Sequence, residues 1–171
     1  MNIFYLSESP SEAAQSLCDV HLRKMIVETC QLLQTHDILH GKERKWKPFG
    51  ENHPCRRALE KKQNYNWLRV YLTCLLEEYE YRFGKSHKCK EIRDAYYKVG
   101  FFQKFYILGN LELEDFPQVM PEECKVHTDF GWVCNSRDAY RNYYRYKKNE
   151  FMKKGIKWSY TKRKEPAWML V

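Results

Sequence analysis

The chain lacks several features that would assign it to a common class. Its 171 residues contain no apolar run approaching the ~18 residues that a membrane-spanning helix needs. The first ten residues, MNIFYLSESP, have neither a basic segment nor a long apolar segment, so we expect no signal peptide. Internal repeats and low-complexity linkers are also absent. These absences predict a cytoplasmic protein without membrane association, folded as a single domain over residues 1–171.

Sequence motifs of familiar catalytic and metal sites are missing too. There are 7 Cys, an odd number, and none forms a C-x-x-C pair, so we expect mostly buried thiols in a reducing compartment. No Walker-type loop, G-x-G-x-x-G or nucleophile elbow occurs. Cys124, His127 and Cys134, or His87 with Cys89, have the right side chains for a metal but not the paired spacing of a structural zinc site. We therefore predict no metal and no cofactor.

The chain does have an excess of basic and aromatic residues. The formal net charge is +8, the sequence pI is about 9.1, and 13 Tyr and 5 Trp contribute to an aromatic content of 16%. Positive charge combined with stackable rings favours a nucleic acid, DNA above all, or a nucleotide as partner. A basic protein whose Lys and Arg side chains only solvate it is the alternative. The oligomeric state is not indicated.

Apolar periodicity and capping residues predict an all-α fold of about five helices. Ser9 and Pro10 begin a short helix after the apolar start MNIFYL, with Glu12 completing a capping box. The other predicted helices run from Asp19, as the cap, to about His40; from His53-Pro54 to Gly84, with a break near 64–67; over 91–105; and from the cap Ser136 to Gly155. The remainder is a basic loop over 41–52, a long irregular loop over 107–135, and a basic aromatic C-terminal tail.

The second predicted helix carries a polar stripe beside its apolar face. Its residues are three and four positions apart, which aligns them on a helix: His21, Lys24, Glu28, Gln31 and Thr35. A solvated flank with one Lys24–Glu28 ion pair is the plain interpretation. The stripe becomes a site only if other polar segments converge on it.

Several segments are candidates for such convergence. His53 lies at a helix start, where free backbone N–H groups favour anions, although it is equally suited to capping. The remaining candidates combine cations, aromatic rings and polar groups suited to phosphates and bases. They are Asn64, Trp67, Glu78 and Arg82 on the long helix; Lys85, His87 and Lys88 after it; Tyr140, Arg141 and Tyr144 on the fifth helix; and Trp158 and Lys162 in the tail.

The layout resembles small phage-type proteins of poorly defined function. The motifs shared with them are D-x-H-x-x-K-M, H-P-C, N-Y-x-W-L, Y-x-Y-R-x-G-K-x-H-K, A-Y-R-x-Y-Y and a closing basic tail with Trp, found here at 19–25, 53–55, 64–68, 79–88, 139–144 and 158–168. The chain is also distantly similar to the pyrimidine-dimer DNA glycosylase (endonuclease V) enzymes. Those are small, basic and helical, with a short apolar start, a polar early helix, a long amphipathic helix and an aromatic tail.

The second resemblance implies a glycosylase/lyase reaction on DNA. In that family the N-terminal α-amine attacks the sugar C1′ and a Glu on the early helix assists, which carries over to Met1 and Glu28. A desolvated Lys24 is the alternative amine, Asp19 the alternative carboxylate, and His21 and His53 would relay protons. Two other functions remain open. One is a non-catalytic phage module that binds a nucleotide, a modified base or a host protein, and the other is a metal-dependent phosphoesterase.

Overall fold

The computed structural model describes residues 2–97, 115–127 and 135–170, and within them the fold is entirely helical, as predicted. The long helices are α2 (Asp19–Leu39), α4 (Lys62–Phe83) and α6 (Ser136–Lys153). The short elements are α1 (Pro10–Gln15), α3 (Pro54–Arg57), α5 (Lys90–Tyr97) and three 3₁₀ turns, η1 (Ala58–Glu60), η2 (Glu122–Cys124) and η3 (Ala167–Met169). No helix among the described residues is long and apolar enough to cross a membrane.

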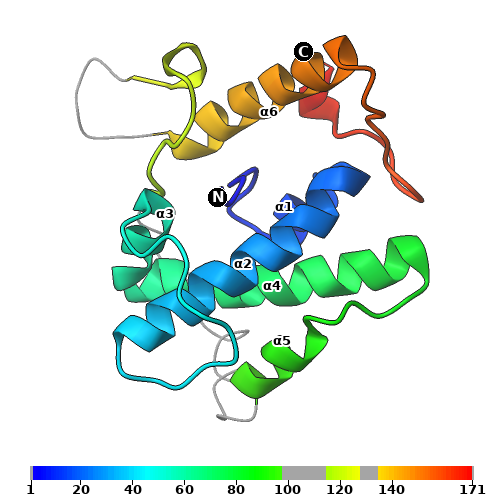
Figure 1. Ribbon diagram of the computed structural model, residues 1–171. Helices are drawn as coiled ribbons and strands as arrows, with labels where there is room; N and C mark the ends of the chain where they lie inside the picture. The colour runs from blue at the N-terminus through cyan, green and yellow to red at the C-terminus, as the bar shows by residue number, and fades with distance from the viewer. Residues whose placement is uncertain (1, 98–114, 128–134, 171) are drawn as a thin grey trace.

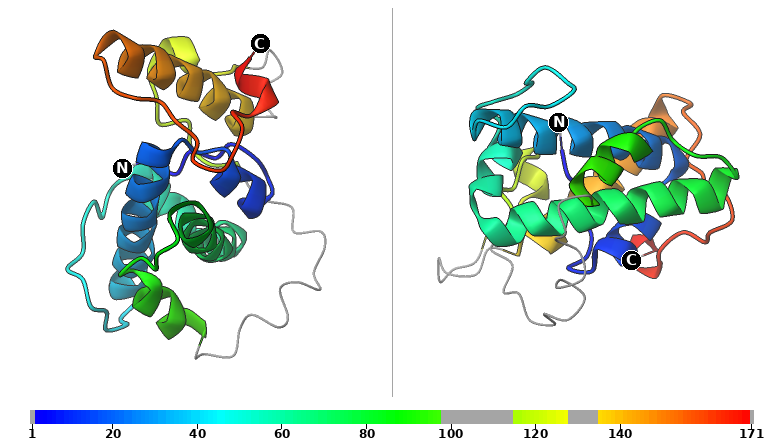
Figure 2. Two further views of the ribbon diagram at one scale, coloured as in Figure 1. Left: turned by 90° about the vertical axis from the view of Figure 1, so that its right-hand side faces the viewer. Right: turned by 90° about the horizontal axis from the view of Figure 1, so that it is seen from below.

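The core forms where α2, α4 and α6 meet the start of the chain. Figures 1 and 2 show α2 and α4 side by side, α5 beyond them, and α6 on the opposite side of α2. The N-terminal segment runs between α2 and α6, and its residues Ile3, Phe4, Tyr5 and Leu6 are all buried. An apolar start therefore acts as a core element, which places the beginning of the chain against the middle of α2.

Helix ends follow local sequence where glycine or a cap determines them. Ser9 Oγ accepts the Glu12 amide N–H at 3.4 Å and caps α1, as predicted. The Glu12 carboxylate does not complete a capping box but accepts from Ser7 Oγ at 2.7 Å. Gly84 ends α4 in the left-handed conformation, at φ 64°, which a residue without Cβ adopts without strain.

Three predicted boundaries differ from the structure. The long helix is broken earlier than at 64–67, because α3 ends at Arg57, η1 ends at Glu60, and α4 begins only at Lys62. The cap of α6 is Asn135 rather than Ser136, and its side chain accepts the Asp138 amide at 3.1 Å. The described part of the fourth predicted helix is α5, and residues 98–105 lie outside the described residues.

The prediction that Asp19 caps α2 is wrong. Cys18 occupies the cap position and provides no side-chain cap bond. The Asp19 carboxylate instead accepts hydrogen bonds from Ser159 Oγ at 2.9 Å and Thr161 Oγ1 at 2.8 Å, both in the C-terminal tail. Partners distant in sequence thus replace the local cap that the residue type suggests.

Candidate active site

The start of the chain meets the polar stripe of α2 at Glu28. The Asn2 amide donates to Glu28 Oε2 at 3.1 Å, and Lys24 Nζ lies 3.4 Å from Glu28 Oε1. The Glu28 side chain is 13% exposed, so its carboxylate is largely shielded yet open at one edge. A carboxylate in this setting retains lone pairs for a further donor or a developing positive charge.

A tight turn brings Asn2 to this position. Phe4 has a φ of 44°, a left-handed conformation that costs a residue with Cβ roughly 1–2 kcal/mol. Asn2 Oδ1 accepts the Phe4 amide at 2.9 Å, and Asn2 Nδ2 donates to the Val119 carbonyl at 3.0 Å. Because its amide N–H and both side-chain polar atoms are engaged, Asn2 is held firmly beside Glu28.

The inner wall of the site combines a thiol and a phenol. The Cys55 sulfur lies 3.9 Å from Tyr140 Oη, which donates to the Pro117 carbonyl at 2.8 Å. Burial raises the pKa of the Cys55 thiol to about 11, and the nearby Glu28 charge contributes in the same direction. Cys55 is therefore a neutral thiol at physiological pH, which argues against a thiolate nucleophile.

A ridge of α6 borders the outer side of the site; we call Tyr143, Tyr146 and Lys147 the α6 ridge. The Tyr143 ring stacks on Phe4 with centroids 5.9 Å apart and on Tyr146 at 6.2 Å. Lys147 Nζ lies 5.2 Å from the Tyr143 ring centroid. These partly exposed rings and the cation, packed against Phe4 two residues after Asn2, form a surface that can contact a base and a phosphate.

Lys24 lies at the site but does not meet the condition under which it was predicted to act. Its side chain is 56% exposed, whereas the amine role rested on desolvation. Met1, the other predicted amine, lies outside the described residues.

His21 does not reach the solvent side of the stripe. Its ring is enclosed by Phe4, Tyr144, Phe151 and Trp158, with centroids 4.8–5.3 Å away. This burial, with the positive charges of Lys24 and Lys147 nearby, lowers the pKa of His21 to about 3. A ring that stays neutral and caged is a packing residue, so the proton relay predicted for it has no support in this position.

His53 takes the capping role that was its alternative. It precedes α3, and its Nδ1 accepts the Cys55 amide at 3.1 Å. Its helix places Cys55 against Tyr140 (the inner wall), so His53 contributes to the site by orienting the chain.

The predicted base-binding residues of α4 lie inside the protein. Asn64 Nδ2 donates to the Ala58 carbonyl at 3.3 Å, and Trp67 Nε1 donates to the Glu8 carbonyl at 2.7 Å. The Trp67 ring is 4% exposed and packs on Tyr5, Tyr71 and Phe116. Neither side chain is directed at the Asn2–Glu28 contact.

Glu78, predicted to bind the substrate, and Arg82, predicted to hold a phosphate, instead form an internal network of ion pairs and hydrogen bonds. Its other members are Asp19, Thr161 and Arg163, and we call it the tail clamp. Arg82 donates to Glu78 at 2.6 Å, to Asp19 at 3.2 Å and to the Leu17 carbonyl at 2.7 Å. Arg163, from the C-terminal tail, donates twice to Glu78, at 3.0 and 2.8 Å. The guanidinium of Arg82 is fully buried, so it has no free face for a phosphate.

The basic connection after α4 is only partly available. Lys85 and Lys88 are exposed, while His87 Nδ1 accepts the Cys89 amide at 3.1 Å and its ring contacts Tyr79. Burial, with Lys88 nearby, lowers the pKa of His87. These residues lie beyond the end of α4 and do not meet Glu28, so the predicted convergence of this segment on the stripe is not seen.

The predicted aromatic and basic residues of α6 and the tail mostly support the core. Tyr140 and Tyr144 are fully buried, and Tyr144 Oη accepts the Cys18 amide at 2.7 Å. Arg141 donates to the Leu6 carbonyl at 3.0 Å. Trp158 packs on His21 and Tyr144, and Lys162 Nζ donates to the Tyr81 carbonyl at 2.9 Å. The tail is thus bound to the helices rather than extended for DNA.

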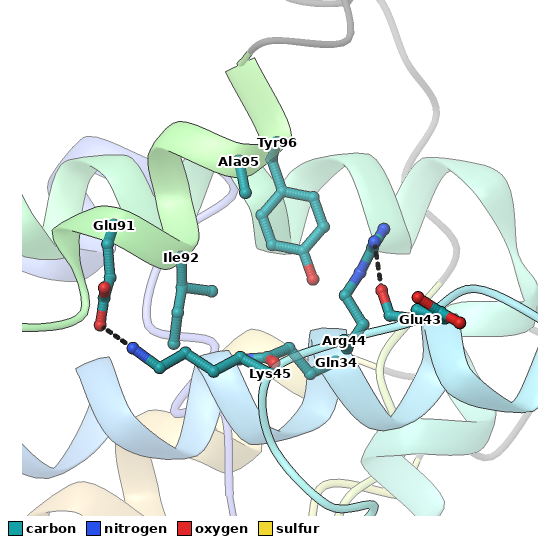
Figure 3. Close-up of a pocket in the computed structure, with 8 residues that line it drawn as sticks. All are labelled: Gln34, Glu43, Arg44, Lys45, Glu91, Ile92, Ala95 and Tyr96. Atoms are coloured by element: carbon teal, nitrogen blue, oxygen red, sulfur yellow. Dashed lines mark hydrogen bonds and ion pairs between the residues drawn. The ribbon is translucent and has the colours of Figure 1, made fainter.

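A separate hollow lies between α2 and α5, away from the α6 side of α2. Its volume is about 200 Å³. Figure 3 shows the residues of its wall, which come from α2 (Gln34), the basic loop (Arg44) and α5 (Ile92 and Tyr96). The Lys45–Glu91 ion pair, at 2.6 Å, crosses its edge. Its lining is mainly apolar and includes none of the predicted catalytic residues.

Sequence reasoning did not select Asn2, Cys55, Tyr143 or Lys147 as site residues. Only the apolar character of residues 3–6 signalled that the start of the chain is buried, and that pattern does not reveal which helix it meets. Tyr143 and Lys147 could be found from their i, i+4 spacing on α6, which places a ring beside a cation.

Comparison with known proteins gives one match. A family model described as pyrimidine dimer DNA glycosylase matches residues 1–91, more than half of the chain. The matched part includes Asn2, Lys24, Glu28 and Cys55. No match was found among curated proteins or among solved structures.

Proposed function

Because the chain belongs to the pyrimidine dimer DNA glycosylase family, we propose that it removes damaged pyrimidines from DNA by attack of the Met1 α-amine on the sugar C1′. The supporting observation is the 3.1 Å contact between the Asn2 amide and Glu28. Three covalent bonds separate the Met1 amine from the Asn2 nitrogen, so the two nitrogens are within roughly 4 Å of each other. We propose on this basis that the amine and the carboxylate act in one site.

The proposed reaction replaces one bond to C1′ with another. The amine lone pair forms an N–C1′ bond, and the electron pair of the glycosidic bond leaves with the base, which takes up a proton. The Glu28 carboxylate, shielded from water, stabilises the positive charge that develops on the sugar. Loss of the amine proton and opening of the sugar ring then give an imine, the intermediate from which strand cleavage by β-elimination proceeds.

We propose that DNA lies over the surface formed by the polar stripe of α2 and the α6 ridge, both of which contact the N-terminal segment. The cations there are Lys24 and Lys147. Both lie near the same buried ring, because the positive charge of each lowers the pKa of His21. Tyr143 and Tyr146 offer ring faces to a base taken out of the stack. The proposed DNA contact surface is therefore the α6 ridge, and no longer Arg82 and the C-terminal tail.

The α-amine is preferred over Lys24 as nucleophile. An amine must be unprotonated to attack, and burial is one way to favour that form. Lys24 is more than half exposed and paired with Glu28, so it is better suited to contact a phosphate or to position the carboxylate.

Borohydride reduction tests this proposal. The full chain is incubated with duplex DNA carrying a cyclobutane pyrimidine dimer, in EDTA, and the imine is reduced to a stable adduct. Mass spectrometry of the digested adduct should place the sugar on the N-terminal peptide. K24M should still form the adduct, whereas a chain extended by residues before Met1 should not.

Other outcomes would overturn the proposal in distinct ways. An adduct on Lys24 would replace the nucleophile but retain the reaction. Binding of DNA or mononucleotides without any adduct or strand cleavage would support the non-catalytic binding module. Activity that requires added divalent ions and disappears in EDTA would support a phosphoesterase.

A further inference from the structure

The end of α2 carries a second polar cluster, distant from Glu28. His36 and His40 are one helical turn apart, so both lie on the same side of the last turn. Glu60, from η1, faces them, and the ligand atoms of the three side chains all lie within 4.8 Å of one another. Two imidazoles and one carboxylate form a donor set well suited to borderline divalent metals.

The protonation pattern at His40 points to a cation. His40 Nδ1 lies 2.8 Å from the His36 carbonyl oxygen, which can only accept, so Nδ1 carries the proton. His40 Nε2 lies 3.1 Å from Glu60 Oε2. A cation between His40 Nε2 and the Glu60 carboxylate would give both acceptor atoms a partner.

His36 supplies an independent observation. The residue is 9% exposed. Within the described part of the chain, its Nδ1 has no hydrogen-bond partner. Buried polar atoms without partners are uncommon and call for an explanation such as a missing ion.

Neighbouring charges leave the cluster accessible to a cation. Asp37 is engaged by Lys42, Arg44 and Tyr65, at 2.6–3.1 Å, and so does not compete for the ion. Arg56 pairs with Glu60 Oε1, which leaves Oε2 directed at His40. The carbonyl groups at the C-terminal end of α2 add negative potential.

We propose that His36, His40 and Glu60 bind a divalent metal ion of the Zn²⁺ type that ties the end of α2 to η1. The ion would replace the His40–Glu60 contact, at about 2.0–2.2 Å from each ligand, after small rotations of the two exposed side chains. It would fix the segment that carries Cys55, without taking part in the chemistry at Glu28. This contrasts with our sequence-based expectation of no metal.

Zn²⁺ titration of the full, chelator-stripped chain by calorimetry tests the site. We expect one ion per chain and a higher melting temperature with Zn²⁺. H40Q and E60Q, on exposed side chains that tolerate substitution, should each weaken binding at least about tenfold. Co²⁺ in place of Zn²⁺ should give visible absorption without thiolate charge-transfer bands.

His127 provides a matched control. It pairs with Glu122 at 2.9 Å on an exposed surface, but it has no third ligand in the described residues. H127Q should leave Zn²⁺ binding unchanged, and so should Glu28→Gln, since that carboxylate lies outside the cluster. Absence of one-to-one binding, wild-type affinity in both H40Q and E60Q, or Co²⁺ bands from thiolates would overturn the proposal.

Discussion

Two carboxylates of α2, Asp19 and Glu28, are used in opposite ways. Asp19 belongs to the tail clamp, where Ser159, Thr161 and Arg82 all donate to it. Glu28 receives the Asn2 amide and an exposed Lys24, and its carboxylate stays open at one edge. A polar cluster whose hydrogen bonds are satisfied within the protein stabilises the fold, whereas one with spare acceptor capacity can act on a substrate.

The largest effect is expected from breaking the tail clamp. Arg82→Met removes the buried cation that Asp19 and Glu78 share, leaving two carboxylates in a poorly hydrated place. We expect a loss of about 3–5 kcal/mol in the free energy of unfolding, measured by urea denaturation. Lys162→Met, which removes an exposed cation of the same tail, should cost less than about 1 kcal/mol. Equal losses of unfolding free energy in Arg82→Met and Lys162→Met would show that the buried cation stabilises the fold no more than the exposed one.

The opposite pattern is expected at the open site. Glu28→Gln retains the shape and an acceptor for the Asn2 amide, but it removes the negative charge facing the sugar. Single-turnover cleavage of the glycosidic bond should slow by about 10²–10³-fold, while the free energy of unfolding changes by less than about 1 kcal/mol. If this variant loses stability like Arg82→Met and keeps its activity, Glu28 is a structural residue.

Acid should weaken the contribution that Asp19 makes to the free energy of unfolding. Burial favours the protonated form of Asp19, but hydrogen bonds from Thr161, Ser159 and Arg82 outweigh it and hold the pKa of that carboxyl below its usual range. A depressed folded-state pKa contributes stability above the unfolded value near 4, and this stability is lost as pH falls through the folded value. The wild type should therefore exceed Asp19→Asn in unfolding free energy at pH 7, and the difference should shrink below about pH 5. Urea titrations at several pH values measure this, and a pH-independent difference would contradict it.

Local sequence signals predicted the helices well because their causes are local. Ser9 begins α1 because its side chain caps the first turn. Gly84 ends α4 because a residue without Cβ adopts the left-handed conformation without strain. Periodicity placed Glu28 at the edge of the buried face for the same reason. These features need no knowledge of what lies elsewhere in the chain.

The tail and the start of the chain were harder to predict, since their partners are remote in sequence. Asp19 is typical of a cap and Trp158 of a DNA-stacking residue, yet each packs with segments that the sequence does not identify as neighbours. Asn2 reaches Glu28 only through the turn at Phe4, an unfavourable conformation that no local pattern signals. Electrostatic composition predicted a DNA-binding class but not which cations stay free to bind.

The smallest effect, and the finest test of where DNA lies, concerns the α6 ridge. Lys147→Gln removes one cation next to Tyr143, so binding to any duplex should weaken modestly, and the slope of log affinity against log salt should decrease by about one. Lys153→Gln removes the same charge from the far end of α6, where the lysine pairs with Glu150. Fluorescence anisotropy over a range of salt concentrations measures both. Both substitutions alter the net charge equally, so a difference between them reports where the DNA lies. A change of slope in Lys153→Gln but not in Lys147→Gln would show that the DNA binds away from the Asn2–Glu28 contact.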